Sequence, residues 1–234
     1  MSSRIETLAS TIETRFGDSL KRVPSPVGEA VYEIVDPGQL REVCIELRDA
    51  QDCAFEQLID LSAVDYLHYG RDEWRTAEAT RSGFSRGVQR GTVEESRDGV
   101  PGHRFAIAYH LLSVTYNRRM RLRAWCTANE PPMVDSVVGV WPSANWYERE
   151  AFDLFGILFR GHPDLRRILT DYGFIGHPFR KDFPLIGNVE VRYDPARSRV
   201  VYQPVTIEPR TLVPRVIRDD NRYDAALKES AHDG

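Results

Sequence analysis

The stretch of the chain from residue 146 to residue 185 constrains the fold most strongly, because charged, aromatic and turn-forming residues are concentrated there. It contains two Gly-His-Pro turns, at residues 161–163 and 176–178, and a pair of basic residues closely follows each turn. Glycine and proline recur too often for a long helix or a central strand. We therefore expect residues 157–185 to form an irregular ribbon that buries little apolar surface of its own and must lie on another surface.

The start of this stretch has the pattern of a short amphipathic helix. Its apolar face recurs at helical spacing and consists of Tyr147, Ala151, Leu154 and Leu158. Asn145 is placed to cap the helix, with Glu148 reaching back to the cap amide. Gly156 is placed to end it in a left-handed conformation. Arg149 and Asp153 lie four residues apart, so we expect them to pair across one turn.

The overall composition describes a globular protein. A chain of 234 residues with 41% hydrophobic content can form one domain with extensions, or two small domains. The net charge of −4 gives no chain-wide basic footprint for nucleic acid. No apolar run approaches the roughly 20 residues that span a bilayer, and residues 1–6 do not begin a signal peptide. We expect a cytosolic chain that could still attach to a membrane protein.

The three cysteines are too dispersed for a typical metal site. Iron–sulfur and zinc sites usually hold two ligands in one local turn, whereas Cys44, Cys53 and Cys126 include no close pair. Cys44 falls on the apolar face of an expected helix and Cys126 on the apolar face of an expected strand. We expect buried structural thiols.

Periodicity predicts two helices and two strands before residue 67. Residues 3–16 form a helix that ends at Gly17. A second helix begins with Asp36 as cap and a first-turn proline, and its buried stripe is Leu40, Val43, Cys44 and Leu47. Residues 31–35 and 55–66 have strand patterns. In the longer strand we expect one face to hold Phe55, Ile59, Leu61 and Ala63, and the other to hold Glu56, Leu58 and Asp60.

Residues 104–114 and 119–127 have the pattern of a β-hairpin that turns at Asn117. The apolar face of its second strand is Met120, Leu122, Ala124 and Cys126, and the other face is Arg119, Arg121, Arg123 and Trp125. This arginine row could bind anions or nucleic acid. Alternatively, the arginines are solvated or pair with acids on neighbouring strands such as Glu56 and Asp60, and we favour this simpler interpretation.

Three further segments complete the organisation. The charged residues 67–102 contain few apolar side chains, so we expect a surface insertion that is partly mobile. Residues 133–141, after Pro131-Pro132, are expected to form a helix with apolar residues Met133, Val134, Val137, Val138 and Trp141. After residue 185 the periodicity ends. The short extended pieces 189–194 and 200–204 cannot form a core, so this tail should be ordered only on a partner.

The chain carries no familiar catalytic motif. It lacks a P-loop, a Gly-x-Gly-x-x-Gly turn, a Gly-x-Ser-x-Gly elbow and a His-Glu-x-x-His pair. Glu148, Glu150 and Asp153 are close enough in sequence to handle protons, but capping and pairing are simpler roles. His162 and His177 precede prolines in turns, and two histidines without further ligands make a poor metal site. We expect both to hydrogen-bond the irregular backbone or a partner.

The basic residues behind the two turns have a different expected role. They are Arg166, Arg167, Arg180 and Lys181. Arginine pairs with carboxylates through two parallel hydrogen bonds. We expect these side chains to hold acidic groups across an interface.

These motifs together carry a family resemblance. Residues 148–156 read Glu-Arg-Glu-x-x-Asp-Leu-Phe-Gly, and the Gly-His-Pro segments continue over residues 161–174 and 176–185. This pattern resembles the signature of the 30-kDa subunit of bacterial NADH–quinone oxidoreductase, which is respiratory complex I. A looser similarity reaches back to residue 105 and forward to residue 205, so the resemblance covers more than half of the chain.

The resemblance implies an α+β fold with a mixed or antiparallel sheet, flanking helices and a long irregular C-terminal arm. The domain would occupy residues 1–156 and the partner-binding arm residues 157–234. Family members carry no flavin, iron–sulfur cluster or metal, whereas the complete enzyme uses NADH, FMN, iron–sulfur clusters and quinone such as ubiquinone, and couples electron transport to proton translocation. The family usually joins the flanking strands by a link much shorter than residues 67–102.

The implied partners are the quinone-site subunit of the 49-kDa type and other subunits of the peripheral arm, at the cytoplasmic side of a bacterial inner membrane. No catalytic residue is expected in this chain. The expected partner interface comprises Trp146, Glu148, Arg149, Glu150, Asp153, His162, Arg166, Arg167, Asp171, Tyr172, His177, Arg180, Lys181, Asp182 and Phe183. One alternative is the equivalent subunit of a membrane-bound hydrogenase or ferredoxin-linked complex, and another is a binding module for anions or nucleic acid.

Overall fold

The computed structural model of the protein describes residues 2–25, 28–67, 69, 74–75, 89–90 and 103–207. The chain divides into two compact units, one made of Met1–Leu67 with Gly102–Pro204 and the other of His68–Pro101 with Val205–Gly234. In the second unit, β4 (Trp74–Arg75) pairs with β5 (Gln89–Arg90). The insertion expected at residues 67–102 lies largely outside the described residues, as does the tail beyond residue 207.

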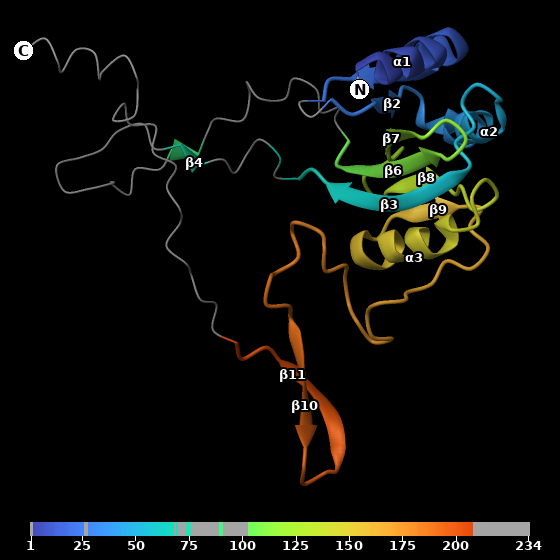
Figure 1. The fold of residues 1–234 in the computed structure, drawn as a ribbon. Helices are drawn as coiled ribbons and strands as arrows, with labels where there is room; N and C mark the ends of the chain where they lie inside the picture. Colours follow the sequence, from blue (N-terminus) through green and yellow to red (C-terminus); the bar gives the residue numbers. More distant parts are fainter. Residues whose placement is uncertain are drawn as a thin grey trace, which may run out of the picture. The chain divides into compact units, whose positions relative to one another are not determined.

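A mixed five-stranded sheet lies at the centre of the first unit (Figure 1). The strands follow the order β1, β2, β7, β6, β3, with bounds Leu20–Val23, Val31–Ile34, Arg118–Trp125, Phe105–Ser113 and Gln57–Asp65. β2 and β7 run parallel, and the other neighbours run antiparallel. This arrangement confirms the expected α+β class with a mixed sheet.

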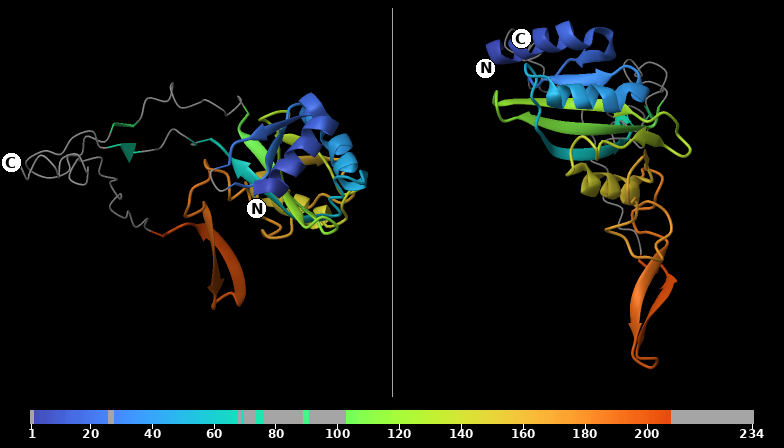
Figure 2. Two further views of the ribbon diagram at one scale, coloured as in Figure 1. Left: turned by 45° about the horizontal axis from the view of Figure 1, so that its top comes forward. Right: turned by 90° about the vertical axis from the view of Figure 1, so that its right-hand side faces the viewer.

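Three α-helices flank this sheet in the described residues, namely α1 (Ser2–Phe16), α2 (Leu40–Asp49) and α3 (Ala144–Phe155). Figure 2 shows α1 beside the β1 end of the sheet and α3 beside the β3 end. Two short 3-10 turns, η1 (Gly17–Ser19) and η2 (Pro37–Gln39), follow α1 and precede α2. The Asp36 side chain accepts a hydrogen bond of 2.9 Å from the Gly38 amide, so Asp36 caps η2, the turn that leads into the second helix.

The core lies where alternate side chains of β6 and β7 meet the helices. Tyr109 of β6 and Leu122 of β7 are cross-strand partners, and both are fully buried. The helices contribute the side chains that their periodicity predicts: Leu8, Ile12, Phe16, Leu40, Val43, Cys44 and Leu47. Burying one large aliphatic side chain stabilises a fold by about 1.5–3 kcal/mol relative to leaving it exposed. These contacts therefore join the N-terminal helices to the sheet.

The β6–β7 hairpin confirms its predicted turn and apolar face. Asn117 has a φ of +49°, a left-handed value that asparagine tolerates, and Met120, Leu122, Ala124 and Cys126 are all buried. Trp125 differs from the expectation, because it is buried although it belongs to the arginine face. Its ring packs against that of Tyr66, with 5.0 Å between the centroids.

The predicted faces of β3 are wrong near its start. A β-bulge between Leu58 and Asp60 inserts one residue against β6. Leu58 is consequently buried at 5% exposure, whereas Ile59 is 41% exposed. One extra residue reverses the alternation of side chains, so the strict period of two placed Ile59 on the wrong face.

The helix predicted for residues 133–141 is also wrong. Residues Met133–Asp135 form β8, which pairs in parallel with β9 (Leu158–Arg160), and turns follow β8. Val134, Val137 and Trp141 are buried as expected, but in extended and turn conformations. β-branched residues such as valine favour strands. The strand conformation of residues 133–135 also depends on pairing with β9, which follows α3 in the chain.

Side chains near α3 protect the outer edge of β3. The Tyr147 hydroxyl donates to the Ile59 carbonyl at 2.8 Å, and the Ser143 hydroxyl donates to the Leu58 carbonyl at 3.4 Å. An exposed strand edge is a template for unwanted pairing. The two hydroxyl groups therefore satisfy two edge carbonyl groups that a further strand could otherwise bond.

The two extended pieces expected in the tail pair with each other. β10 (Val189–Asp194) and β11 (Arg199–Pro204) form an antiparallel hairpin. Residues 161–188 between β9 and this hairpin contain no helix or strand, as expected for the irregular ribbon. The expected start of the ribbon differs, because residues 158–160 form β9. Leu158 therefore belongs to a strand and not to the apolar face of the helix.

Candidate functional site

The C-terminal end of α3 is the first anchor of the ribbon, residues 157–185. The last carbonyl groups of a helix have no partners within that helix. Here the second Gly-His-Pro turn supplies donors for three consecutive carbonyls. His177 Nδ1 lies 2.8 Å from the Asp153 carbonyl oxygen, and the Phe179 amide donates to the Leu154 carbonyl at 3.0 Å. Arg180 Nε donates to the Phe155 carbonyl at 2.6 Å.

The ionisation of His177 fits this capping role. Burial is the largest influence on the ring and lowers the pKa of His177 below its usual value. A neutral imidazole carries one N–H, and with the proton on Nδ1 it donates to the Asp153 carbonyl. His177 thus bonds the chain's own backbone, one of the two roles expected from sequence.

Gly156 permits the close approach of the ribbon to the end of α3. It has a φ of +73° and forms the left-handed end of the helix, as predicted. A Cβ atom at this position would lie 2.5 Å from His177 Nε2 and 2.6 Å from Arg180 Nη2. Both the backbone conformation and the packing therefore require glycine here.

The buried Asp153 side chain is the second anchor. Its Oδ2 atom accepts hydrogen bonds of 3.0, 2.7 and 2.9 Å from the amides of Ile168, Leu169 and Thr170. Its Oδ1 atom accepts a 2.5 Å bond from the Thr170 hydroxyl and lies 3.4 Å from Arg167 Nη1. Burial alone would raise the pKa of Asp153, but these hydrogen bonds outweigh it and hold the pKa below its usual value. The carboxylate therefore fixes the middle of the ribbon.

The expected pairing of Asp153 with Arg149 does not form. Arg149 Nε donates instead to the Arg166 carbonyl at 3.3 Å, and the Arg149 guanidinium lies 4.9 Å from the centroid of the Trp146 ring. Asp153 faces the ribbon, where backbone amides satisfy it better than one side chain could. Arg149 also bonds the ribbon, through the Arg166 carbonyl.

The third anchor joins the ribbon to the sheet. Arg104 Nη2 lies 2.7 Å from Asp65 Oδ2 and 2.9 Å from Asp182 Oδ1. The Lys181 amide also donates to Asp65 Oδ2, at 2.9 Å. Arg104 stands just before β6 and Asp65 ends β3, so this network ties the ends of two strands to the ribbon. No local sequence pattern predicts the contact between Asp65 and Arg104, because the two residues lie 39 positions apart.

Glu148 holds α3 to the segment after β8 rather than capping the helix. The helix begins at Ala144, which places Asn145 inside it, and the side chain of the N-cap residue Ser143 makes no capping hydrogen bond. Glu148 is fully buried and accepts hydrogen bonds of 2.7 Å from both the Ser136 hydroxyl and the Val137 amide. Burial raises the pKa of Glu148 to about 7 despite these two bonds.

The fifteen residues expected at the interface separate into three groups. Glu148, Arg149 and Asp153 are buried and bond the chain's own groups; a partner contact by these three stays a prediction. The exposed members are Trp146, Glu150, Arg166, Asp171, Tyr172, Lys181 and Asp182, and the half-buried members are His162, Arg167, His177, Arg180 and Phe183. The structure brings most of the half-buried group onto the three anchors; any partner contact by them or the exposed group stays a prediction.

His162 is likewise engaged within the chain. Its Nε2 atom lies 3.2 Å from the Asn145 carbonyl oxygen, and its Nδ1 atom accepts a 3.0 Å hydrogen bond from the Asp164 amide. These contacts hold the first Gly-His-Pro turn against the start of α3. Both histidines therefore hold the ribbon to α3 through hydrogen bonds with backbone groups.

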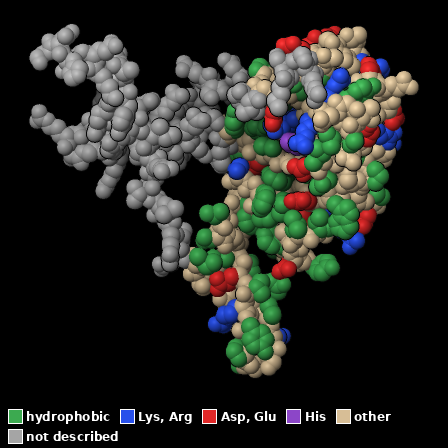
Figure 3. Space-filling view, in the orientation of Figure 1, with side chains coloured by type: hydrophobic (Ala, Val, Ile, Leu, Met, Phe, Trp, Pro, Cys, Tyr) green, Lys and Arg blue, Asp and Glu red, His purple; other side chains and the backbone are tan. Residues whose placement is uncertain are grey.

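The anchored ribbon leaves large apolar side chains uncovered. Tyr172 and Leu185 are fully exposed, the other exposed members are Leu169, Ile175 and Phe179, and Ile186 is exposed directly after the ribbon. Figure 3 shows further hydrophobic side chains on the hairpin that follows the ribbon. Apolar side chains gathered on a well-anchored segment are typical of a surface that contacts another protein. The basic residues of this segment predicted a partner-facing surface, and the exposed apolar side chains were not part of that prediction.

The arginine face of β7 is largely neutralised. Arg121 Nη2 lies 3.0 Å from Glu29 Oε2, and Arg123 forms an ion pair with Glu33. The expected pairing with acids is present, but Glu56 and Asp60 are the wrong acids. Glu56 accepts from the Val114 amide and Asp60 from the Ser62 hydroxyl, because β3 lies two strands from β7.

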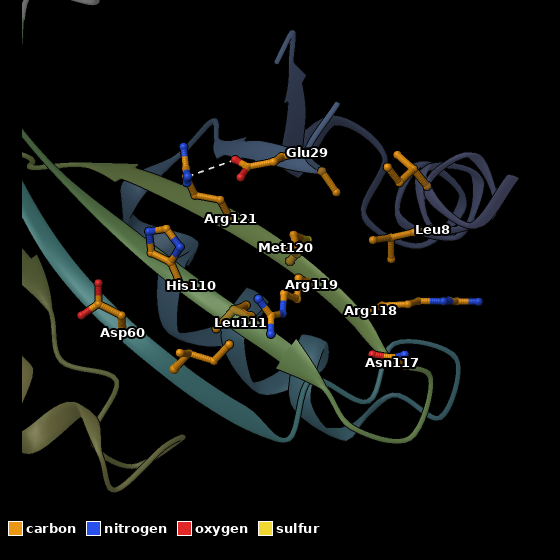
Figure 4. Close-up of a pocket in the computed structure, with 13 residues that line it drawn as sticks. Leu8, Glu29, Asp60, His110, Leu111, Asn117, Arg118, Arg119, Met120 and Arg121 are labelled. Carbon is orange, nitrogen blue, oxygen red and sulfur yellow. Dashed lines mark ion pairs between the residues drawn. The ribbon is translucent and has the colours of Figure 1, made fainter. Parts of the chain in front are cut away.

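A groove of about 530 Å³ lies beside this face, between α1 and the sheet (Figure 4). Leu8 and Ile5 line one side, and His110, Arg119 and Arg121 line the other. The lining also holds Arg118, Glu29 and Asp60, so three arginines face two acids and Arg121 is paired with Glu29. The arrangement does not favour an anion or nucleic-acid site.

The described residues show neither a metal cluster nor a helix able to cross a bilayer. No three His, Cys, Asp or Glu side chains among them converge on one point, and none of their helices has the length and apolar content for a membrane span. Cys44, Cys53 and Cys126 are buried free thiols, as predicted. Burial raises the pKa of Cys53 to about 11 and that of Cys126 to about 12.

Comparison with known proteins gives full-length relatives, each of them the NADH-quinone oxidoreductase subunit designated C. The relative from Halorhodospira halophila is 54% identical over 239 residues, which cover 98% of this chain and 97% of that protein. The relatives from Coxiella burnetii and Xanthomonas campestris are 52% and 50% identical, and the matches cover 96% and 98% of this chain and 98% and 97% of those proteins.

Two solved structures match part of this chain. The trypsin-resistant fragment (1–134) of Nqo5 is 25% identical with a TM-score of 0.48, over 68% of this chain and 99% of that one. A chain of the membrane-bound sulfane sulfur reductase, an archaeal respiratory membrane complex, is 15% identical with a TM-score of 0.50, over 77% and 86%. Residues 34–189 match the family model described as respiratory-chain NADH dehydrogenase, 30 Kd subunit. Together with relatives at least 50% identical over almost the whole chain, this match shows that the chain belongs to the family of the 30-kDa subunit of respiratory-chain NADH dehydrogenase.

Proposed function

We propose that this chain is a structural subunit of an NADH–quinone oxidoreductase, in which it supports the subunit that forms the quinone site. The single observation that carries the proposal, beyond the family, is the anchored ribbon with uncovered apolar side chains. Leu169 lies within the segment pinned by Asp153, Tyr172 follows that segment, and Phe179 donates its amide to the end of α3. A segment held in one conformation loses little conformational entropy on docking. The ribbon therefore suits a permanent contact with another subunit.

In this proposal the chain contributes position rather than chemistry. The complete enzyme transfers electrons from NADH through FMN and iron–sulfur clusters to quinone, and it pumps protons. The efficiency of such steps depends steeply on the distance and orientation of the reacting groups. A rigid subunit that fixes its neighbour preserves that geometry.

The chain holds no cofactor of its own in this proposal. Iron–sulfur clusters bind cysteine thiolates. The three cysteines are buried, and burial raises the pKa of each thiol, which keeps them protonated at neutral pH. Attachment to the membrane, at the cytoplasmic side of a bacterial inner membrane, then comes from other subunits of the complex.

Purification of the tagged chain from its native membranes tests the proposal. We expect the other subunits of an NADH–quinone oxidoreductase to co-purify, identified by mass, together with NADH-dependent reduction of quinone. Co-purification with hydrogenase subunits would replace this function by the hydrogenase alternative. The relatives from Halorhodospira halophila and Coxiella burnetii, both subunits of NADH-quinone oxidoreductase, favour the first outcome.

Limited proteolysis provides an independent test. Residues after 185 contain the exposed hairpin and should be cut faster in the isolated chain than in the complex, because a partner covers them there. Equal rates of cleavage in both samples would contradict a partner-bound arm. The core of the sheet serves as an internal reference, since it should resist cleavage in both samples.

A further inference from the structure

The β10–β11 hairpin has one apolar face and one polar face. In its register Val191 pairs with Tyr202 and Tyr193 pairs with Val200. Directly opposed residues project from the same face of a two-stranded sheet. With the pair Val189 and Pro204, the first face consists of Val189, Val191, Tyr193, Val200, Tyr202 and Pro204.

The opposite face is predominantly polar. It consists of Glu190, Arg192, Asp194, Arg199, Val201 and Gln203. Both acids of this face have partners. Gln203 donates a hydrogen bond to Glu190 across the strands, and Arg197 of the connecting turn lies 3.7 Å from Asp194. The two faces of the hairpin therefore differ clearly in polarity. No layer of described residues packs on the apolar face.

The apolar face is uncovered in the part of the chain that the structure describes. Val191, Tyr193, Val200 and Tyr202 are 53%, 59%, 56% and 62% exposed, and Val189 is 54% exposed. Apolar patches above a few hundred Å² are uncommon on soluble monomers and usually mark an interaction site. A strand pair with such alternation is normally half of a sheet that packs on something.

We propose that this apolar face docks on an apolar surface of another subunit of the same enzyme. The inference rests on the proposed function and adds the face and the chemistry of the contact. The polar face, with Glu190 and Arg192, stays toward solvent. The docked surface presents aliphatic and aromatic side chains, since the two tyrosines and the β-branched valines offer flat apolar area.

The size of the face favours a partner that also contacts the ribbon. The face holds six residues, far fewer than the roughly 20–30 that each partner contributes to a stable free-standing interface. A second copy of this chain, held through this face alone, would therefore bind weakly. Leu185 and Ile186 are also exposed and precede β10 directly. The face and these residues form consecutive parts of the arm, and one partner surface can cover both.

The composition of the hairpin favours a protein surface over a lipid surface. Segments that lie in a membrane interface combine a strongly basic polar face with Trp, Phe or Leu on the other. Here the polar face mixes the acids Glu190 and Asp194 with Arg192 and Arg199. An acidic side chain beside each basic one removes most of the attraction to anionic lipid.

Site-specific photo-crosslinking in the assembled complex tests the proposal. A benzophenone amino acid is introduced singly at Tyr193 or Tyr202 on the apolar face, and at Arg192 or Gln203 on the polar face as matched controls on the same strands. We expect the first pair to crosslink to another subunit in high yield and the second pair to give little product. Products are identified by mass after purification of the complex.

Each other outcome overturns the inference. Crosslinks mainly from Arg192 and Gln203 would show that the opposite face docks. Products with lipid alone, with a second copy of this chain or within this chain would show a different occupant. The proposed function fails separately, if the purified sample contains no NADH–quinone oxidoreductase subunits. A complex with all subunits but without apolar-face crosslinks contradicts only the docking of this face.

Substitution by threonine gives a second measurement that preserves strand propensity. The variant Val191→Thr/Tyr193→Thr/Tyr202→Thr should lower the recovery of the chain with the complex about tenfold, because aromatic anchors dominate such contacts. The control Arg192→Thr/Val201→Thr should leave recovery unchanged. Equal recovery of both variants would overturn the inference.

Discussion

Arg180 Nε donates a 2.6 Å hydrogen bond to the carbonyl of Phe155, which ends α3, and the Arg180 guanidinium lies 5.2 Å from the centroid of the Phe105 ring. One side chain thus joins the ribbon to a helix end and to the start of β6. Cations near a helix C-terminus also interact favourably with the helix dipole. Arg180 is therefore part of the scaffold of this chain, in addition to any role at an interface.

Gly156→Ala should destabilise the protein more than Gly161→Ala. Both glycines have positive φ, +73° and +82°, so each substitution costs about 1–2 kcal/mol in backbone conformation. A Cβ at position 156 additionally collides with His177 and Arg180, whereas position 161 has nothing within 4 Å. Urea denaturation of both variants measures the difference. Equal losses in the free energy of unfolding would show that the ribbon yields without cost.

Glu148→Gln should flatten the pH dependence of stability. The folded-state pKa of Glu148 is about 7, raised by burial from the ordinary 4.5. A carboxyl with a raised pKa contributes stability that is fully present below the unfolded pKa and is lost as pH rises through the folded pKa. This contribution is on the order of 3 kcal/mol between pH 4.5 and pH 7. The amide does not titrate, so its variant lacks that decline.

The measurement is the free energy of unfolding of wild type and Glu148→Gln at several pH values in this window. Glu150→Gln is the matched control, because it removes the same charge from an exposed neighbour on α3. The control should follow the wild-type curve. A Glu148→Gln curve with the wild-type slope would contradict a titrating buried carboxyl.

Arg104→Met should cost far more stability than Asp182→Asn. Arg104 pairs with Asp65, whose side chain is 0% exposed, and with Asp182, whose side chain is 52% exposed. Removing one partner of a buried ion pair costs about 3–5 kcal/mol, whereas an exposed ion pair contributes at most about 1 kcal/mol. Thermal and urea unfolding of the two variants should therefore differ clearly. Similar small losses would mean that the amides of Leu67 and Lys181 suffice for Asp65.

Arg166→Ala separates an interface role from a structural one. Arg166 lies 2.8 Å from Asp164, and the two side chains are 66% and 56% exposed. The substitution should leave the free energy of unfolding nearly unchanged, because exposed ion pairs contribute little to stability. If Arg166 contacts a partner, recovery of the complex falls while this stability stays constant.

Arg180→Ala serves as the comparison for Arg166→Ala, since its loss leaves the Phe155 carbonyl and Phe105 ring without their contacts. It should lower both stability and assembly. Unchanged assembly in Arg166→Ala would remove Arg166 from the interface, and unchanged stability in Arg180→Ala would contradict its capping role.

The sequence predicted those structural features that depend on residues close together in the chain. The stripe of α2 and the glycine end of α3 follow from helix period and from the conformational freedom of Gly156. The helix expected at residues 133–141 failed because a short apolar run fits helix and strand alike. There the choice depends on β9, which lies on the far side of α3.

The candidate site was predicted only in part for the same reason. The capping pattern at Asn145 and Glu148 is local, but the fold gives Glu148 better partners in Ser136 and Val137. Asp65 and Arg104 are 39 residues apart. No periodic pattern connects them, so their bond follows only from the pairing of β3 with β6.

The contact between Asp65 and Arg104 affects how much the connection between β3 and β6 can vary in length. Asp65 and Phe105 face each other across the β3–β6 ladder, and Arg104 clasps Asp65 beside them. The two strand ends are thus tied together by their own contacts, so the segment that joins them need not hold them in place. The entropic cost of closing a loop grows only slowly with its length. We therefore expect the sheet to keep its register when this connection is lengthened, for example by an inserted tag.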